Sequence, residues 1–330
     1  MVFNSIFFIF CFLPVFMLIY YLVPGKLRNL LLFLGSLIFY AWGEPVYVIL
    51  MLFSSIFNYY MGTELERLYY DDRKQKINLI FSIIINLAVL VFFKYYGFLL
   101  NTIGGIIGIH IPHPELSLPI GLSFYTFRNL SYLFDIYLSK VSAQRNFLTF
   151  AVYSTMFPYT SAGPIVRYTD IETQLKQRTI NISRFGIGAE LFVKGLAKKV
   201  LLADNLSVLY SSICGHPQMS VFTSWLGILA YTMQLYFDFS GYSDMAIGLG
   251  KMLGFDFNKN FDYPYISTSV SEFWRRWHIS LGSWFRDYIY IPLGGNRVST
   301  LKHIRNILVV WALTCLLYTS DAADDSLRVD

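Results

Sequence analysis

Apolar residues in this chain come in long blocks rather than in the stripes that an amphipathic surface helix shows. Four such blocks occupy the N-terminal part, at Ile6–Val23, Leu30–Trp42, Val46–Met61 and Ile77–Phe93. Each is close to, or somewhat under, the ~20 residues that cross ~30 Å of hydrocarbon. The pattern predicts an all-α protein, a polytopic integral membrane helical bundle. We expect the first block to be a span and not a cleaved signal peptide, because no basic segment precedes it.

Loops that carry basic residues alternate along the chain with loops that carry none, and this alternation predicts a membrane topology. Lysine and arginine occur at 24–29, 63–76 and 139–146, whereas the N-terminus and residues 101–118 carry none. Since cytoplasmic loops carry the excess of lysine and arginine, we expect the basic loops inside and the N-terminus outside. A further span over Leu118–Leu138 would return the chain to the cytoplasmic side.

The pattern changes after residue 146, where apolar segments become short or carry charges. Phe147–Tyr159 runs into a Pro/Gly segment, which ends a helix. Leu191–Leu202 places lysines among apolar residues, which favours an amphipathic helix at the membrane interface over a membrane span. Trp225–Leu253 predicts one long helix. We therefore expect about eight to ten membrane-embedded helices, some re-entrant or interfacial, around a funnel built from residues 147–300.

Composition supports a membrane protein rather than a nucleic-acid-binding or disulfide-rich one. Of 330 residues, 55% are hydrophobic and 14% are charged, against about 25% charged in soluble domains. The net charge of +5 comes from loop residues that set topology. Cys11, Cys214 and Cys315 are far apart, which indicates buried thiols rather than disulfides or a zinc site. We expect no metal site at His110 and His113, because prolines interrupt that segment and no third ligand is near.

One polar segment differs from this apolar background, at Ser271–Ser280, which reads Ser-Glu-Phe-Trp-Arg-Arg-Trp-His-Ile-Ser. Ionisable residues near a bilayer are costly, so a cluster of them indicates function. His278 is our candidate for acid–base catalysis, because imidazole titrates near neutral pH; bracing a helix at the cytoplasmic face is the alternative. Arg275, Arg276 and Trp277 could bind the phosphates of an acyl donor, or they could anchor the segment at the membrane interface.

A second set of polar residues lies in the long helix predicted at Trp225–Leu253. Asp238, Tyr242 and Asp244 interrupt its apolar surface. They could line a cavity and bind substrate, or they could mark a helix end that meets cytoplasmic water. On a regular helix the two aspartates would point about 240° apart, and Gly241 between them could loosen the helix.

Four segments carry a resemblance to a known family: Leu118–Phe127, Ala162–Arg167, Tyr236–Gly250 and Glu272–Ser280. Together they resemble the membrane-bound O-acyltransferases, and most closely the bacterial branch that O-acetylates alginate. The D-alanyl transfer proteins of teichoic acid modification are similar but more distant. The resemblance predicts one O-acyltransferase domain over residues 1–317, incomplete at its C-terminal end.

The resemblance implies an enzyme that passes an acetyl group from a cytoplasmic donor to hydroxyls of an extracytoplasmic polysaccharide such as alginate. It implies acetyl-CoA or another acyl thioester as donor, no bound cofactor, and a bacterial inner membrane as the location. Membrane lipid and extracytoplasmic polysaccharide-modifying proteins are the expected partners. A transporter without acyl-transfer chemistry is the alternative, because broken helices and polar cavities are equally expected there. The polar residues do not recur in two matched halves, which favours the enzyme.

The C-terminal end departs from the family pattern. The histidine usually given the catalytic role in the family lies in a Trp-His-Gly motif on a later helix, and Tyr318 stands at its position here. The apolar stretch Ile307–Leu317 has 11 residues, or about 17 Å of helix, before acidic residues follow. We therefore expect residues 318–330 to be foreign or frameshifted, and the chain as it stands to be inactive; a natural short variant is the alternative.

Overall fold

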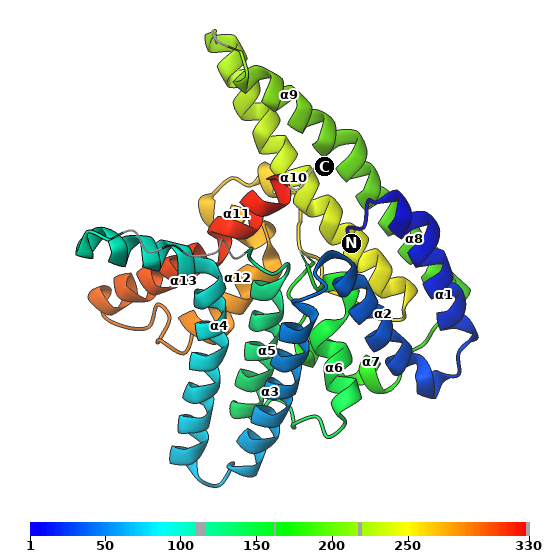
Figure 1. Ribbon diagram of the computed structural model, residues 1–330, viewed down its shortest axis with the longest axis vertical. Coiled ribbons are helices and arrows are strands. Elements are labelled where there is room, and N and C mark those ends of the chain that lie inside the picture. Colours follow the sequence, from blue (N-terminus) through cyan, green and yellow to red (C-terminus); the bar gives the residue numbers. More distant parts are fainter. Residues whose placement is uncertain (110–111, 113–116, 162, 217–219, 328–330) are drawn as a thin grey trace. The chain divides into compact units, whose positions relative to one another are not determined.

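The computed structural model describes the backbone of residues 1–109, 112, 117–161, 163–216 and 220–327, and the side chains of those up to residue 314. Every regular element in these ranges is a helix, which confirms the all-α prediction (Figure 1). The α-helices are α1 (Leu13–Leu22), α2 (Arg28–Gly43), α3 (Val48–Arg67), α4 (Asp72–Ile107), α5 (Leu122–Tyr137), α6 (Phe147–Thr155), α7 (Tyr168–Lys176), α8 (Ile182–Ala197), α9 (Asp204–Cys214), α10 (Val221–Met252), α11 (Val270–Arg276), α12 (Ile279–Phe285) and α13 (Thr300–Leu327). Short 3-10 or π-helical segments lie at Phe8–Phe12, Gly25–Leu27, Phe157–Tyr159, Lys198–Ala203, Pro264–Ile266 and Arg286–Tyr290.

The chain forms two compact units. The first comprises residues 1–39, 156–166 and 170–282, and the second comprises residues 40–155, 167–169 and 283–330. Within the part of the chain that the structure describes, α3 and α4 are the two helices long and apolar enough to cross a membrane. Both belong to the second unit.

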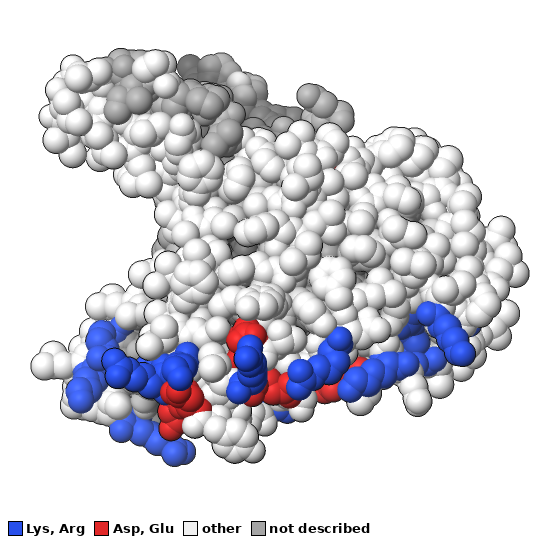
Figure 2. All heavy atoms as spheres, turned by 60° about the horizontal axis from the view of Figure 1, so that its bottom comes forward, with Lys and Arg blue, Asp and Glu red and all other residues white. Residues whose placement is uncertain are grey.

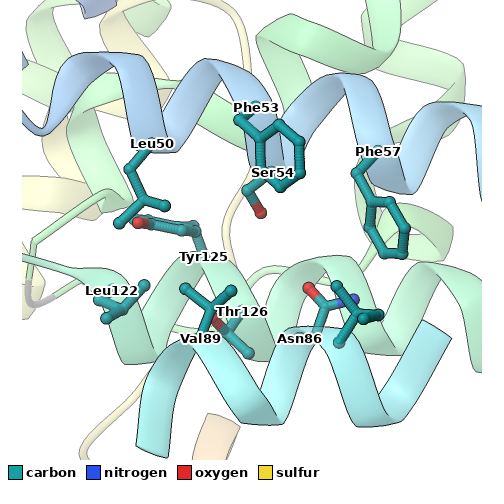
Figure 3. A pocket seen from close by; sticks show the side chains of 10 residues that line it. Leu50, Phe53, Ser54, Phe57, Asn86, Val89, Leu122, Tyr125 and Thr126 are labelled. Atoms are coloured by element: carbon teal, nitrogen blue, oxygen red, sulfur yellow. The ribbon is translucent and has the colours of Figure 1, made fainter. Parts of the chain in front are cut away.

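Polar side chains face inward between the helices of the second unit. The amides of Asn58 on α3 and Asn86 on α4 bond to each other at 3.0 and 2.9 Å. Asn129 of α5 donates to Ser54 Oγ at 3.1 Å and accepts from Ser154 Oγ of α6 at 3.0 Å. Figure 3 shows Ser54 and Asn86 among the side chains that line a small pocket between α3, α4 and α5. These bonds satisfy amides and hydroxyls that lipid could not.

The outward surfaces of the same helices are apolar, the reverse of a soluble bundle. The exposed side chains include Ile49, Phe53, Ile56, Ile77, Ile80, Phe81 and Ile84. On α3 and α4 the charged residues lie at 64–76, where α3 ends and α4 begins, and at Lys94, while 48–63 and 77–93 carry none. Figure 2 shows charged side chains at one edge of the face in view, and the other described residues that are visible on that face are uncharged. An apolar exterior over a polar interior, with charges at one end, is typical of helices that sit in lipid.

In the first unit α8 and α10 pack backbone to backbone through paired glycines. A Cβ on Gly195 would lie 2.5 Å from the carbonyl oxygen of Gly241, and a Cβ on Gly248 would lie 2.6 Å from that of Gly188. The two helices therefore run antiparallel at a distance that only small residues permit. The prediction that Gly241 loosens the helix is wrong, because α10 is continuous from Val221 to Met252 and Gly241 serves this close approach.

The structure confirms several predicted elements with shifted ends. The long helix predicted at Trp225–Leu253 begins four residues earlier, at Val221. The apolar segment from Phe147 ends as a helix at Thr155, and a 3-10 turn containing Pro158 follows. Proline lacks the amide hydrogen that continues a helix, so the break falls where the sequence predicts it.

Leu191–Leu202 is helical, as the sequence predicts, and it lies within a longer run, because α8, the π-helical segment Lys198–Ala203 and α9 follow one another without a break. The prediction of buried cysteines is wrong. The side chains of Cys11 and Cys214 are exposed at the surface of the protein, not buried. Helix α13 runs from Thr300 to Leu327 and contains the apolar stretch Ile307–Leu317. His110 and His113, for which we expected no metal site, lie outside the described residues.

Candidate functional site

The segment around His278 is fixed by a helix cap and a strained turn. Ser269 caps α11 by accepting a hydrogen bond from the Glu272 amide at 3.2 Å, and Glu272 accepts in return from the Thr268 amide at 3.0 Å. Helix α11 ends at Arg276, and His278 then adopts a left-handed φ of 42°. A non-glycine residue in this region is strained, so its surroundings must hold it there.

Asn260 is the hub that holds His278. Its Oδ1 accepts from Ser280 N at 3.2 Å, from Ser280 Oγ at 2.9 Å and from His278 Nδ1 at 3.1 Å. Its Nδ2 donates to Ser243 Oγ of α10 at 3.1 Å. Ser280 Oγ in turn accepts from the Ile165 amide at 3.0 Å. Three separate stretches of the chain therefore meet at one buried asparagine.

This network determines the protonation of the imidazole. The backbone N–H of Ser280 can only donate, so the atom it meets on Asn260 is the oxygen, and His278 Nδ1 must carry the hydrogen that this oxygen accepts. Nε2 is then the basic nitrogen. Burial lowers the pKa of His278 from 6.5 to about 3, so the ring is neutral at pH 7 and a weaker base than an exposed histidine.

Aromatic rings complete the enclosure of the imidazole and join the two sequence motifs. The Phe239 ring of α10 meets the His278 ring edge to face, with centroids 4.7 Å apart. Phe261 lies 5.1 Å from Trp277, which stacks in turn on Phe273 at 5.6 Å. The structure thus brings together the α10 motif and the segment 272–280, which the sequence predicted separately.

The two predicted aspartates lie against lysines rather than against His278. Asp238 pairs with Lys199 at 2.8 Å, and Asp244 pairs with Lys198 at 2.6 Å. Lys199 also reaches Asp204 at 3.0 Å. Both lysines lie in the π-helical segment that follows α8, a type of irregularity that is frequent at functional sites. Adjacent lysines there meet both carboxylates, even though a regular helix would point the two aspartates apart.

The remaining predicted residues fall in different environments. The Tyr242 hydroxyl bonds to Ser161 Oγ, and its ring stacks on Phe3 with centroids 4.7 Å apart. Trp277 is buried. Arg276 is bound within its own segment, to Glu272 at 2.8 Å and to the Asp262 carbonyl at 3.2 Å.

The ion pair between Arg276 and Glu272 distinguishes Arg276 from the neighbouring Arg275, and Glu272 has a lowered pKa. Hydrogen bonds from the Thr268 amide, then from Arg276, lower the pKa of Glu272 to about 2. Arg275, in contrast, is exposed and forms no ion pair with any residue that the structure describes. Of the two arginines, Arg275 is therefore the one available to an anionic ligand.

Sequence reasoning missed the residues that hold these groups. Asn260 and Ser243 lie 18 and 35 residues before His278, and no periodicity links them to it. Lys198 and Lys199 were interpreted as membrane-interface residues and not as carboxylate partners. Ser280 was part of the motif, and its position two residues after His278 was the one available signal. Among the described residues, no three side chains of the metal-ligating types gather into a site.

Comparison with known proteins identifies the class to which this arrangement belongs. The family model of MBOAT, the membrane-bound O-acyltransferase family, matches residues 48–316. This chain is therefore a member of the membrane-bound O-acyltransferase family, as its motifs predicted.

Particular relatives share most of the chain. It is 44% identical over 317 residues to the probable alginate O-acetylase AlgI of Pseudomonas aeruginosa, an alignment that covers 95% of this chain and 61% of that protein. It is 43% identical to AlgI of Azotobacter vinelandii, over 95% of this chain and 64% of that protein. It is 34% identical to the peptidoglycan O-acetyltransferase of Helicobacter pylori, over 95% of this chain and 66% of that protein. The chain thus spans about three-fifths of the length of the AlgI proteins.

Proposed function

We propose that this protein serves as a membrane O-acyltransferase that passes an acetyl group from a cytoplasmic donor to hydroxyls of an extracytoplasmic polysaccharide such as alginate. The relatives named for O-acetylation of alginate and of peptidoglycan, both glycan polymers, support this proposal over 95% of the chain. The observation that carries it in the structure is the imidazole of His278 at the junction of two family motifs, kept neutral by burial and held in one tautomer by Asn260.

The chemistry requires a hydroxyl to attack the carbonyl carbon of a thioester while a base removes the hydroxyl proton. We propose that His278 accepts this proton at Nε2 and that Asn260 positions it through Nδ1. The new ester bond forms as the carbon–sulfur bond breaks, and the proton can then pass to the departing thiolate. The burial that lowers the pKa of His278 keeps the base unprotonated at neutral pH.

The donor is proposed to be acetyl-CoA or another acyl thioester, with no resident cofactor. Arg275 supports a phosphate-bearing donor, because its guanidinium is exposed and not committed to a described carboxylate. The ion-paired Asp238 and Asp244, with Tyr242, are proposed to contact the acyl or hydroxyl substrate. Arg276, paired with Glu272, and Trp277, which is buried against Phe261, are proposed to shape the donor site rather than to bind phosphate.

The proposed setting is a bacterial inner membrane that the chain crosses several times, with helices around a funnel and the N-terminus outside. Extracytoplasmic acetyltransferases or other polysaccharide-modifying proteins are the proposed partners. The charge-free stretches 48–63 and 77–93, on either side of the charged residues 64–76, support this placement. Single cysteines introduced at 64–76 should react with a membrane-impermeant maleimide only after the cells are opened. Labelling in intact cells would reverse the proposed orientation.

The test of function is the ester content of the host polymer. Cells in which the gene is deleted should produce exopolysaccharide without O-acetyl esters, and the gene in trans should restore them. A transporter without acyl-transfer chemistry is the second candidate. Unchanged ester content together with reduced export of the polymer would favour the transporter and overturn the acyltransferase proposal.

A further inference from the structure

Outside the His278 region, the first unit holds two arginines that converge on one buried tyrosine. Arg178 Nε donates to Tyr20 Oη at 2.8 Å, and its guanidinium carbon lies 5.8 Å from the centre of the Tyr20 ring. The guanidinium carbon of Arg28 lies 5.9 Å from the same centre. Neither arginine forms a salt bridge with any residue that the structure describes. Two like charges therefore share one partly buried place without a carboxylate.

The hydrogen bonds that Arg178 donates go to neutral acceptors, and a buried N–H of Arg28 has no acceptor among the described residues. Arg178 donates to Asn29 Oδ1 at 2.8 Å and to the Gln174 carbonyl at 3.4 Å, besides Tyr20. Arg28 Nε is buried and has no hydrogen-bond partner among the described residues. Burial lowers the pKa of Arg178, and the nearby charge of Arg28 adds to this effect. The arrangement costs free energy in the protein alone, and an anion would recover it.

Two simpler explanations do not account for the pair. Positive residues that only anchor a cytoplasmic loop stay exposed, as Lys26 does two residues before Arg28. Arginines could also compensate the C-terminal end of α10, where carbonyl oxygens carry partial negative charge. The last carbonyls of that helix are already satisfied, however, because Met252 O accepts from the Tyr21 hydroxyl and Leu253 O from the Tyr20 hydroxyl, at 2.8 and 2.7 Å.

The neighbouring charges leave the region positive. The Arg178 guanidinium lies 4.8 Å from the centre of the Phe255 ring, and Asp256 is the next residue along the chain after Phe255. Asp256 is already bound by Arg184 at 2.7 Å and by Lys251 at 2.5 Å. The Asp256 carboxylate thus pairs with two other cations, and the structure describes no ion pair between it and Arg178 or Arg28.

We propose that Arg28 and Arg178 form a binding site for a phosphate group. Guanidinium groups match phosphate oxygens with two parallel hydrogen bonds, and they bind most strongly where water is partly excluded. Both arginines are half-buried, so part of each remains reachable. The loop 24–29 is expected at the cytoplasmic face, where the phosphate can belong to a coenzyme A thioester or to the headgroup of an anionic phospholipid. The site includes none of the residues proposed above for acyl transfer, and its binding test does not depend on acyl transfer.

The test measures binding to the purified protein in detergent, with two probes that separate the two sources of phosphate. Coenzyme A is titrated by calorimetry, and phosphatidylglycerol is titrated by native mass spectrometry. Arg28→Gln removes no hydrogen bond to a described residue, so it should fold like the parent. It should weaken binding of one probe by about tenfold to a hundredfold, the loss expected for a charge-assisted contact. Arg178→Gln should do the same.

Lys26→Gln is the matched control, since it removes one positive charge from the same loop and should leave both affinities unchanged. Weaker coenzyme A binding in the arginine variants assigns the site to a nucleotide phosphate, and weaker phosphatidylglycerol binding assigns it to a lipid. The proposal is overturned if the parent protein binds neither probe, if Arg28→Gln binds both as the parent does, or if Lys26→Gln weakens binding equally. Should Arg178→Gln not fold, Arg28→Gln alone decides.

Discussion

Replacing Asn260 by alanine should destabilise the first unit more than any exposed substitution nearby. The side chain is 1% exposed. Its oxygen accepts three hydrogen bonds, two from Ser280 and one from His278, and its nitrogen donates to Ser243. Alanine removes all four bonds and leaves the donors in a place that water does not reach.

The size of the loss follows from the groups left behind. The Ser280 amide and the His278 Nδ1–H lose the acceptor that the structure gives them, and Ser243 Oγ loses a donor. A buried polar group without a partner costs about 1–3 kcal/mol, so the three groups together should cost about 3–9 kcal/mol. This is a large part of the 5–15 kcal/mol that typically separates folded from unfolded states. The left-handed backbone of His278 also loses its restraint.

Thermal unfolding of the purified protein in detergent measures this loss. Asn260→Ala should melt well below the parent, whereas Asn258→Ala, at an exposed position of the same segment, should melt with it. Asn260→Asp should recover part of the stability, because it restores the oxygens, and the new carboxylate should raise the pKa of His278 in an NMR titration. An Asn260→Ala protein as stable as Asn258→Ala would show that the network contributes nothing and refute the reasoning.

Three further predictions concern other contacts of the first unit. Burial lowers the pKa of His278 from 6.5 to about 3, so between these pH values the unfolded chain binds one more proton than the folded protein. The free energy of unfolding should therefore fall by up to about 1.4 kcal/mol per pH unit as the pH drops from 6 to 4, and His278→Gln should flatten that slope. Gly195→Leu places side-chain atoms against the α10 backbone and should abolish folding, while Gly186→Leu, with open space around it, should express normally. Lys199→Met strands two carboxylates and should reduce O-acetyl esters on the host polymer along with thermal stability, whereas Lys194→Met, from an exposed pair, should change neither.

The sequence predicted the elements whose cause is local. Helix α6 ends where Pro158 removes a backbone donor, and α10 is long because its apolar run contains no proline. The interpretation of Leu191–Leu202 as an amphipathic helix took Lys198 and Lys199 as residues that face water, and it missed the ion pairs that they form. Their partners are carboxylates on another helix, and spacing along one helix carries no information about the charges that a neighbouring helix presents.

The same limit applies to the candidate site. Composition and a dense motif were enough to find His278, but its tautomer is set by Asn260, and aromatic rings from other segments enclose it. A single chain shows which residues can do chemistry. It does not show which distant residue fixes their geometry, because that contact forms only when the chain turns back on itself.

Basic residues illustrate how far one sequence rule can reach. The positive-inside rule treats Lys26 and Arg28 alike, since both lie in one short loop, and it treats Arg275 and Arg276 alike for the same reason. The structure separates each pair. Lys26 is exposed, while Arg28 joins a distant arginine around a buried ring; Arg276 is tied to Glu272, while Arg275 is not. Position along the chain predicts the side of the membrane, but only three-dimensional partners decide which cation is left to bind an anion.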